Sequence, residues 1–183
     1  MRSATRPGAS ASGPDARRPI ALAVVALAAA AAVAVLAAAA SGDAPALQKG
    51  RVEWVSDGDT ITVRIGETKE KVRMVGIDTP ELDDANPWWR ALAERARDHA
   101  RSRLLGRTVV LEPDAIGADR DKYGRLLRYV ILDGEDVNEE MIREGYARAY
   151  TRFAFGRATR YREAEKAARA AKIGRWTPRE TRR

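Results

Sequence analysis

The sequence predicts a mainly β protein: a small closed barrel of short strands, accompanied by three α-helices. Three observations predict this fold class. Segments that alternate apolar and polar residues recur between glycine-containing turns, as in antiparallel strands. One helical segment interrupts the strands and two follow them. The chain has 183 residues, 45% of them hydrophobic, which gives room for one such core with terminal extensions.

The first three strands are expected to form a meander. Their alternating segments are residues 51–55, 60–65 and 70–77. Asp57-Gly58 supplies turn chemistry between the first two, and a second turn precedes the third strand, which ends at Asp78. Because short turns join these segments, neighbouring strands are expected to pair antiparallel.

Three helices are expected from their start and stop signals. Asn86-Pro87 opens the first and Gly106 ends it, with apolar residues at fourfold spacing between them. The other two follow the last strand: a short one that Gly145 stops, and one over roughly residues 159–172. The short helix has one apolar face, and the last helix has alanines on one side and arginines on the other.

The last two strands, residues 108–111 and 126–132, are joined by a long acidic loop, and loops of this length often carry function. The strands thus follow a meander-and-return order, with one helix inserted after the third. This order predicts a five-stranded barrel of the OB-fold kind with three α-helices, preceded by an N-terminal hydrophobic helix.

The chain before residue 50 is expected to lie outside the barrel. Residues 1–18 are polar and are expected to be disordered in the cytoplasm. Within residues 19–41, the run 20–40 is wholly apolar, and as a helix it would span roughly 31 Å, about one bilayer core. Two arginines precede it, so the rest of the chain is expected to be exported, either anchored in the membrane or secreted after signal-peptide cleavage. The remaining boundaries are a linker at 42–49, the barrel domain at 50–177 and a basic tail at 178–183.

Composition narrows the chemistry. The formal net charge of +7 favours a polyanionic partner, although part of that charge lies in the N-terminal segment. There is no cysteine, which excludes disulfides, thiolate metal sites and cysteine nucleophiles. The only histidine, His99, lies in a helical segment and is expected at the surface. Zinc sites and histidine-based triads are therefore disfavoured.

Two carboxylates suggest a metal site. Asp59 begins the second strand and Asp78 ends the third, so we expect them to be neighbours across the sheet. Calcium and magnesium take oxygen ligands from separate strands in this way. The alternative is that each aspartate caps a turn.

Arginines nearby suggest phosphate binding, with one geometric difficulty. Arg73 and Asp78 are five positions apart, so strict alternation places them on opposite faces of a strand. They can serve one site only if the strand bulges or twists between them, and Gly76 is the expected place. Arg125 follows a loop that offers Lys122 and Tyr123, which suits phosphate, with simple surface solvation as the alternative.

Several motifs together resemble the staphylococcal nuclease (thermonuclease) family. They occur in that family's order and with comparable spacing: VSDGDT at 55–60, VRMVGIDTPE at 72–81, DKYGRLL at 121–127, VNE at 137–139 and GRW at 174–176. The resemblance covers roughly residues 50–177. It implies an OB-fold nuclease that uses calcium to hydrolyse DNA and RNA and leaves 3′-phosphate products.

The resemblance also implies roles for single residues. Asp59 and Asp78 correspond to the carboxylate ligands of calcium, and the backbone carbonyl of Thr79 completes the protein's share. Arg73 and Arg125 correspond to the catalytic arginines that bind phosphate.

Further roles follow in the same way. Glu81 corresponds to the residue that orients or deprotonates the attacking water. Lys122 and Tyr123 correspond to contacts with the terminal phosphate of the substrate, and Tyr150 to an aromatic neighbour. The expected partner is single-stranded or frayed DNA, or RNA, bound by a monomer, with the membrane as a further partner if residues 20–40 are retained.

Two other interpretations are compatible with the fold. A nuclease-like OB module can keep the barrel and only bind nucleic acid or protein at the cell envelope, with weak or no catalysis. Such relatives would lack some of the acidic and arginine positions, whereas Arg73, Glu81 and Arg125 are all present here. A barrel that binds a lipid or sugar head group would leave the two arginines and two carboxylates unexplained.

Overall fold

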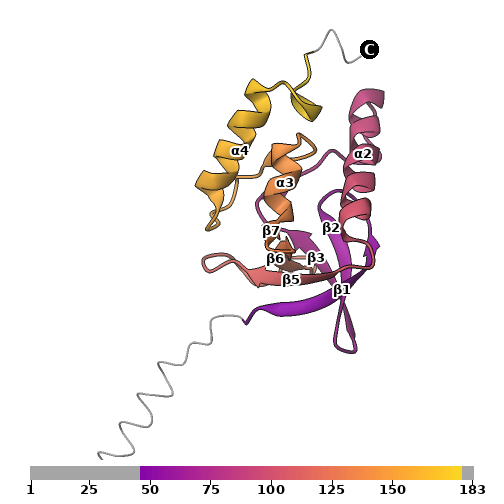
Figure 1. Cartoon of the computed structure of the whole chain (residues 1–183), viewed down its shortest axis with the longest axis vertical. Coiled ribbons are helices and arrows are strands. Elements are labelled where there is room, and N and C mark those ends of the chain that lie inside the picture. Colours follow the sequence, from indigo (N-terminus) through magenta and orange to yellow (C-terminus); the bar gives the residue numbers. More distant parts are fainter. Residues whose placement is uncertain (1–45, 179–183) are drawn as a thin grey trace, which may run out of the picture. The chain divides into compact units, whose positions relative to one another are not determined.

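The computed structural model describes residues 46–178, and their strands close into a barrel (Figure 1). The strands are β1 Gln48–Val55, β2 Thr60–Ile65, β3 Thr68–Met74, β4 Ile77–Asp78, β5 Thr108–Pro113, β6 Leu126–Leu132, β7 Glu135–Asp136 and β8 Arg148–Ala149. The main sheet has the order β3-β2-β1-β5-β6-β7, and a parallel pairing of β3 with β6 closes it.

The expected fold class is confirmed, with three differences in the strands. The third strand ends at Met74, because the chain breaks at Val75-Gly76 and resumes as the two-residue strand β4. Strands β4, β7 and β8 are too short to show a periodic pattern, and the sequence did not indicate them. Strand β1 begins at Gln48, inside the stretch expected to be a linker, because its first residues pair with β5.

The three expected helices are present: α2 Pro87–Leu104, α3 Val137–Arg143 and α4 Ala158–Ala170, followed by a short 3₁₀ helix, η1 Gly174–Trp176. The Asn86 side chain caps α2 by accepting hydrogen bonds from the backbone amides of Trp88 and Trp89. The apolar residues spaced along α2 are buried, as their spacing predicts.

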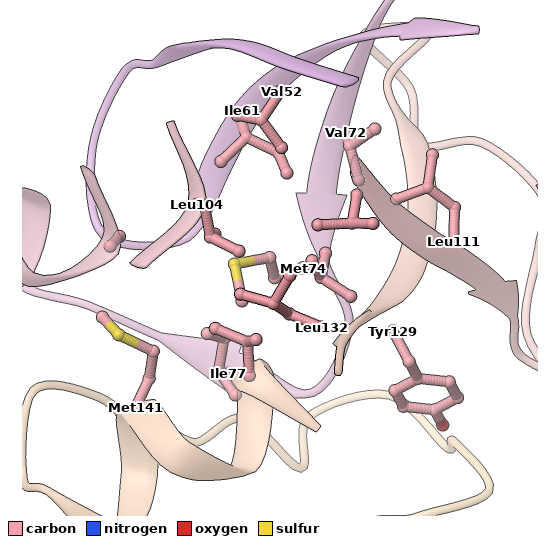
Figure 2. Packing of buried hydrophobic residues seen from close by; sticks show 14 of the residues in the cluster. Val52, Ile61, Val72, Met74, Ile77, Leu104, Leu111, Tyr129, Leu132 and Met141 are labelled. Carbon is pink, nitrogen blue, oxygen red and sulfur yellow. The ribbon is translucent and has the colours of Figure 1, made fainter. Parts of the chain in front are cut away.

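The hydrophobic core lies inside the barrel and extends to α2 and α3. Figure 2 shows side chains from several strands and both helices in one cluster, with Leu104 of α2 and Met141 of α3 near Met74 and Leu132 of the barrel. All four of these side chains are buried. This packing fixes the strand ends from which the polar residues of the candidate site project.

Asn138 joins the end of β3 to the rest of the barrel. It is fully buried, and its Oδ1 accepts a hydrogen bond from the amide of Val130 at 3.0 Å. Its Nδ2 donates to the carbonyls of Val75 at 3.0 Å and Arg128 at 3.2 Å. One side chain therefore bonds to two backbone groups of β6 and to one in the break after β3.

Replacing Asn138 by alanine is expected to lower the free energy of unfolding by about 3 kcal/mol, since it removes three hydrogen bonds to buried or partly buried backbone groups. The matched control is Asn86→Ala, which removes only the exposed cap of α2 and should cost about 1 kcal/mol. Urea denaturation of both variants measures the difference. Equal costs would contradict the assigned role of Asn138.

The predictions for residues 1–18 and 19–41, including the apolar run 20–40, lie outside the described residues. So do the first half of the linker expected at 42–49 and most of the basic tail. No helix within residues 46–178 has both the length and the apolar character needed to cross a membrane.

Candidate active site

The break at Gly76 organises the site. Gly76 has a φ of +74°, and a Cβ atom there would lie 2.5 Å from the ring of Phe155, so any larger residue would be strained and crowded. After the break, β4 leaves the main sheet and pairs with β8, with Asp78 opposite Arg148. The chain beyond Gly76 is thus directed differently from β3.

This break lets Arg73 reach the residues beyond it. Its guanidinium donates to the carbonyls of Met74 at 2.8 Å and Ile77 at 2.9 Å. Its Nη2 also lies 3.1 Å from Oδ2 of Asp59. The expected distortion near Gly76 is therefore present, and Arg73 is held against the site instead of being a solvated strand residue.

Asp59 is a buried carboxylate with several partners. Its Oδ2 accepts from the amide and the hydroxyl of Thr79, both at 3.1 Å, and its Oδ1 accepts from the hydroxyl of Thr60 at 3.1 Å. Burial raises the pKa of Asp59 to about 6, against the lowering effect of Arg73. The carboxylate therefore carries a charge that its surroundings compensate only in part.

Asp78 does not lie across the ladder from Asp59, contrary to the expectation. The amide of Met74 donates to the carbonyl of Asp59, so Met74 faces that position. Asp78 instead comes near through the break, because the next residue, Thr79, bonds to Asp59. The Asp78 carboxylate accepts from Nε of Arg148 at 2.8 Å.

Glu81 completes the acidic group. Its side chain is exposed at the surface, yet its pKa is raised, first by partial desolvation and then by the charges of Asp59 and Asp78. A carboxyl whose pKa is raised is a stronger base than an ordinary glutamate once it is deprotonated. Glu81 therefore lies within the electrostatic influence of both aspartates.

Arg125 approaches the same group from the loop before β6. Its Nε donates to Asp121 at 2.7 Å, and its Nη1 donates to the hydroxyl of Thr60 at 3.4 Å. Because Thr60 bonds to Asp59, the two arginines Arg73 and Arg125 are linked through two residues. The structure thus brings Arg73 to the Asp59 carboxylate and Arg125 to the neighbouring Thr60.

A cleft of about 660 Å³ adjoins the arginines. Its polar lining includes both arginines together with Asp78 and the three predicted substrate-binding residues, Lys122, Tyr123 and Tyr150. Tyr123 is 72% exposed, with the Lys122 ammonium 4.9 Å and the Arg125 guanidinium 5.5 Å from its ring centre. Tyr150 pairs with Phe153 on the other part of the lining, at 6.0 Å between ring centres. The cleft therefore combines cations with aromatic faces.

A smaller pocket of about 250 Å³ also adjoins Asp78. Its lining includes Thr79 and Glu81, which do not line the larger cleft, and the arginines Arg148 and Arg175. Sequence reasoning missed Arg148 because its role depends on β8, which is too short for a periodic signal. Arg175 belongs to the GRW segment at 174–176, which was recognised as a family motif but was assigned no function.

A second polar group lies between α2 and α3. His99, Glu140 and Glu144 bring ligand atoms within 4.8 Å of one another, and within residues 46–178 no other group of three histidine or carboxylate side chains does so. His99 is not a surface residue as expected, because it contacts Glu140 at 3.1 Å and its ring stacks on Tyr146. Arg103 binds both oxygens of Glu140, so this group already joins the two helices by ion pairs.

The family follows from comparison with known proteins. A model of the family described as staphylococcal nuclease homologue matches residues 71–178, more than half of the chain. The chain belongs to the staphylococcal nuclease homologue family. The matched segment contains Arg73, Asp78, Glu81 and Arg125, the residues that the break at Gly76 and the loop before β6 bring to the site.

Individual proteins are also similar to this chain. A thermonuclease of Staphylococcus hyicus is 36% identical over 131 residues, which cover 71% of this chain and 76% of the relative. Endonuclease YncB of Bacillus subtilis is 41% identical over 92 residues, covering 50% of this chain and 43% of YncB. An uncharacterized protein of Bacillus anthracis is 36% identical over 133 residues, 70% of this chain and 61% of its own length. The chain thus spans less than two thirds of the last two relatives.

Proposed function

We propose that this protein is a nuclease that hydrolyses phosphodiester bonds in DNA and RNA, depends on calcium and leaves 3′-phosphate products. The observation that carries the proposal is the break at Gly76, which brings Arg73, Asp59 and the chain from Asp78 to Glu81 to one place. The family membership supports the same reaction class, since relatives are named thermonuclease and endonuclease.

The residues present suit a calcium ion. Asp59 and Asp78 offer carboxylate oxygens and Thr79 offers a backbone carbonyl, which are the donor types that calcium prefers. The partly uncompensated charge of Asp59 favours a cation. When bound, the ion would stabilise negative charge on the phosphate and lower the pKa of a coordinated water. Because Asp78 is paired with Arg148, the ion would compete with that arginine for the carboxylate.

The protein's own side chains supply the remaining chemistry. Arg73 and Arg125 each present a planar fork that matches two phosphate oxygens, and their attraction grows as the phosphate gains charge in the transition state. Glu81 accepts the proton of the attacking water, and its raised pKa suits that role. Lys122, Tyr123 and Tyr150 line the cleft where the rest of the substrate lies.

Cleavage assays test this function directly. The full chain is incubated with single-stranded DNA or RNA in the presence of calcium, magnesium or a chelator, and the product ends are analysed. We expect cleavage with calcium, none with chelator, and 3′-phosphate ends. Cleavage that persists in chelator would contradict the metal dependence. Binding without cleavage under any divalent ion would favour the non-catalytic OB module.

We extend the proposal to an exported location, as a monomer, with residues 20–40 acting as an anchor or as a cleaved signal. The support is the apolar sequence of that run and the arginines before it. The mass of the protein in membrane and secreted fractions distinguishes the two cases. Full-length protein confined to the cytoplasmic fraction would rule out both.

A further inference from the structure

The two pockets of the site meet at Asp78. The larger cleft contains Arg73 and Arg125, and the smaller pocket contains Glu81, so the reacting phosphate lies between them in the proposed function. A nucleic acid chain continues on both sides of the bond that is cut. One neighbouring nucleotide therefore lies toward the larger cleft and the other toward the smaller pocket.

We propose that the smaller pocket is a second nucleotide subsite, which binds the base on the opposite side of the cleaved bond from the larger cleft by stacking on Trp89. This inference rests on the proposed nuclease function and deepens it. It assigns to Trp89 and Arg148 the recognition of a strand that extends through the site.

Trp89 is held as a fixed aromatic surface. It lies in the first turn of α2, where Pro87 begins the helix and the Asn86 cap accepts from the amides of Trp88 and Trp89 at 2.9 and 3.4 Å. The ring of Trp88 meets it edge-on at 4.5 Å, and the guanidinium of Arg175 lies 5.3 Å from its centre. A ring held on two sides loses little freedom when a base stacks on it.

The arginines of the smaller pocket already have partners at Asp78. Three carboxylates line this pocket, those of Asp78, Glu81 and Asp84, against two arginines. Both arginines are already bound to Asp78, Arg148 through the carboxylate at 2.8 Å and Arg175 through the backbone carbonyl at 3.0 Å. A base in the interior would meet an aromatic face and hydrogen-bond acceptors.

Arg148, at the edge of the pocket, is suited to bind a phosphate of the nucleic acid backbone. Its side chain is 49% exposed and is anchored at Nε, so its terminal nitrogens can turn toward a phosphate. The pocket volume of about 250 Å³ is well under half that of the cleft, as expected for a place that takes a single base. The size of the pocket and the fixed ring of Trp89 therefore agree on one nucleobase.

A cycle of enzyme and substrate changes tests the subsite. The substrates are dinucleotides with a single phosphodiester bond: one intact, one lacking the first base and one lacking the second. The enzymes are the full-length wild type, Trp89→Ala, Trp89→Phe and the control Trp54→Ala. Trp54 lies on β1, is 56% exposed and lines neither pocket. Thermal melts establish that each variant is folded.

We expect Trp89→Ala to lower kcat/KM on the intact dinucleotide about 10-fold, within the range for one stacked base. Removing the base that binds in the smaller pocket should lower kcat/KM of the wild type by the same factor. On that substrate, Trp89→Ala should have no further effect. On the substrate that lacks the other base, the variant should still lose about 10-fold. Trp89→Phe should keep most of the rate because it keeps an aromatic face, and Trp54→Ala should match the wild type.

Other outcomes overturn the inference. If Trp89→Ala loses the same factor on all three substrates, or none, the pocket does not bind a base, while wild-type cleavage still upholds the nuclease function. If the wild type cleaves neither the dinucleotides nor any nucleic acid of greater length, the nuclease function fails. The same cycle is then measured as dinucleotide affinity by calorimetry, and additive losses there would reject the subsite as well.

Discussion

Replacing Arg73 by lysine is expected to lower kcat by about 10²–10³-fold, the usual cost of removing one donor to a charge that develops in the transition state. Lysine keeps the positive charge beside Asp59 but lacks the planar fork that binds two phosphate oxygens. KM should change less than kcat, because the lost contacts strengthen as the phosphate gains charge. Steady-state kinetics on single-stranded DNA with calcium measures both constants.

Arg64→Lys is the matched control for this substitution. Arg64 also forms an ion pair with a carboxylate, Glu53, on the barrel, but it lines neither pocket of the site. Its replacement should leave kcat within about twofold of wild type, since exposed ion pairs contribute little. If Arg73→Lys retains wild-type kcat, Arg73 has no role in the chemical step and serves only to hold the break at Gly76.

Glu81→Gln is expected to lower kcat by about 10²–10⁴-fold, the range for loss of a general base. The change keeps the size of the side chain and removes its charge and basicity. Unlike its activity, the stability of this variant should not fall. The folded-state pKa of Glu81 is raised, so the ionised carboxylate is disfavoured by folding at neutral pH, and the neutral amide should leave stability unchanged or slightly higher.

Kinetics and urea denaturation at pH 7 on the same preparation measure the two effects of Glu81→Gln. Glu94→Gln, an exposed position on α2, is the control and should affect neither. A loss of activity that comes with a loss of stability would point to misfolding. Wild-type activity in a stable Glu81→Gln protein would instead require another base.

The barrel was largely predictable because its signals are local. Period-two alternation located β1, β2 and β3, the apolar segments 108–111 and 126–132 located β5 and β6, and the caps and glycines located the three helices. The two-residue strands had no such signal, since an alternating pattern needs more positions to appear. The expected pairing of Asp59 with Asp78 was wrong for the same reason, because it assumed that β3 continues through Gly76.

The sequence by itself determined the set of side chains with the chemistry for a phosphodiester: two arginines, Arg73 and Arg125, with carboxylates at the start of the second expected strand and the end of the third. It also indicated Gly76 as the place for a bulge or twist if Arg73 and Asp78 serve one site, because strict alternation places them on opposite faces. Only the tertiary structure decided which charges meet. Arg148 pairs with Asp78 across 70 positions and Arg125 reaches Thr60 across 65. Such contacts depend on the path of the closed barrel, and no local pattern encodes that path.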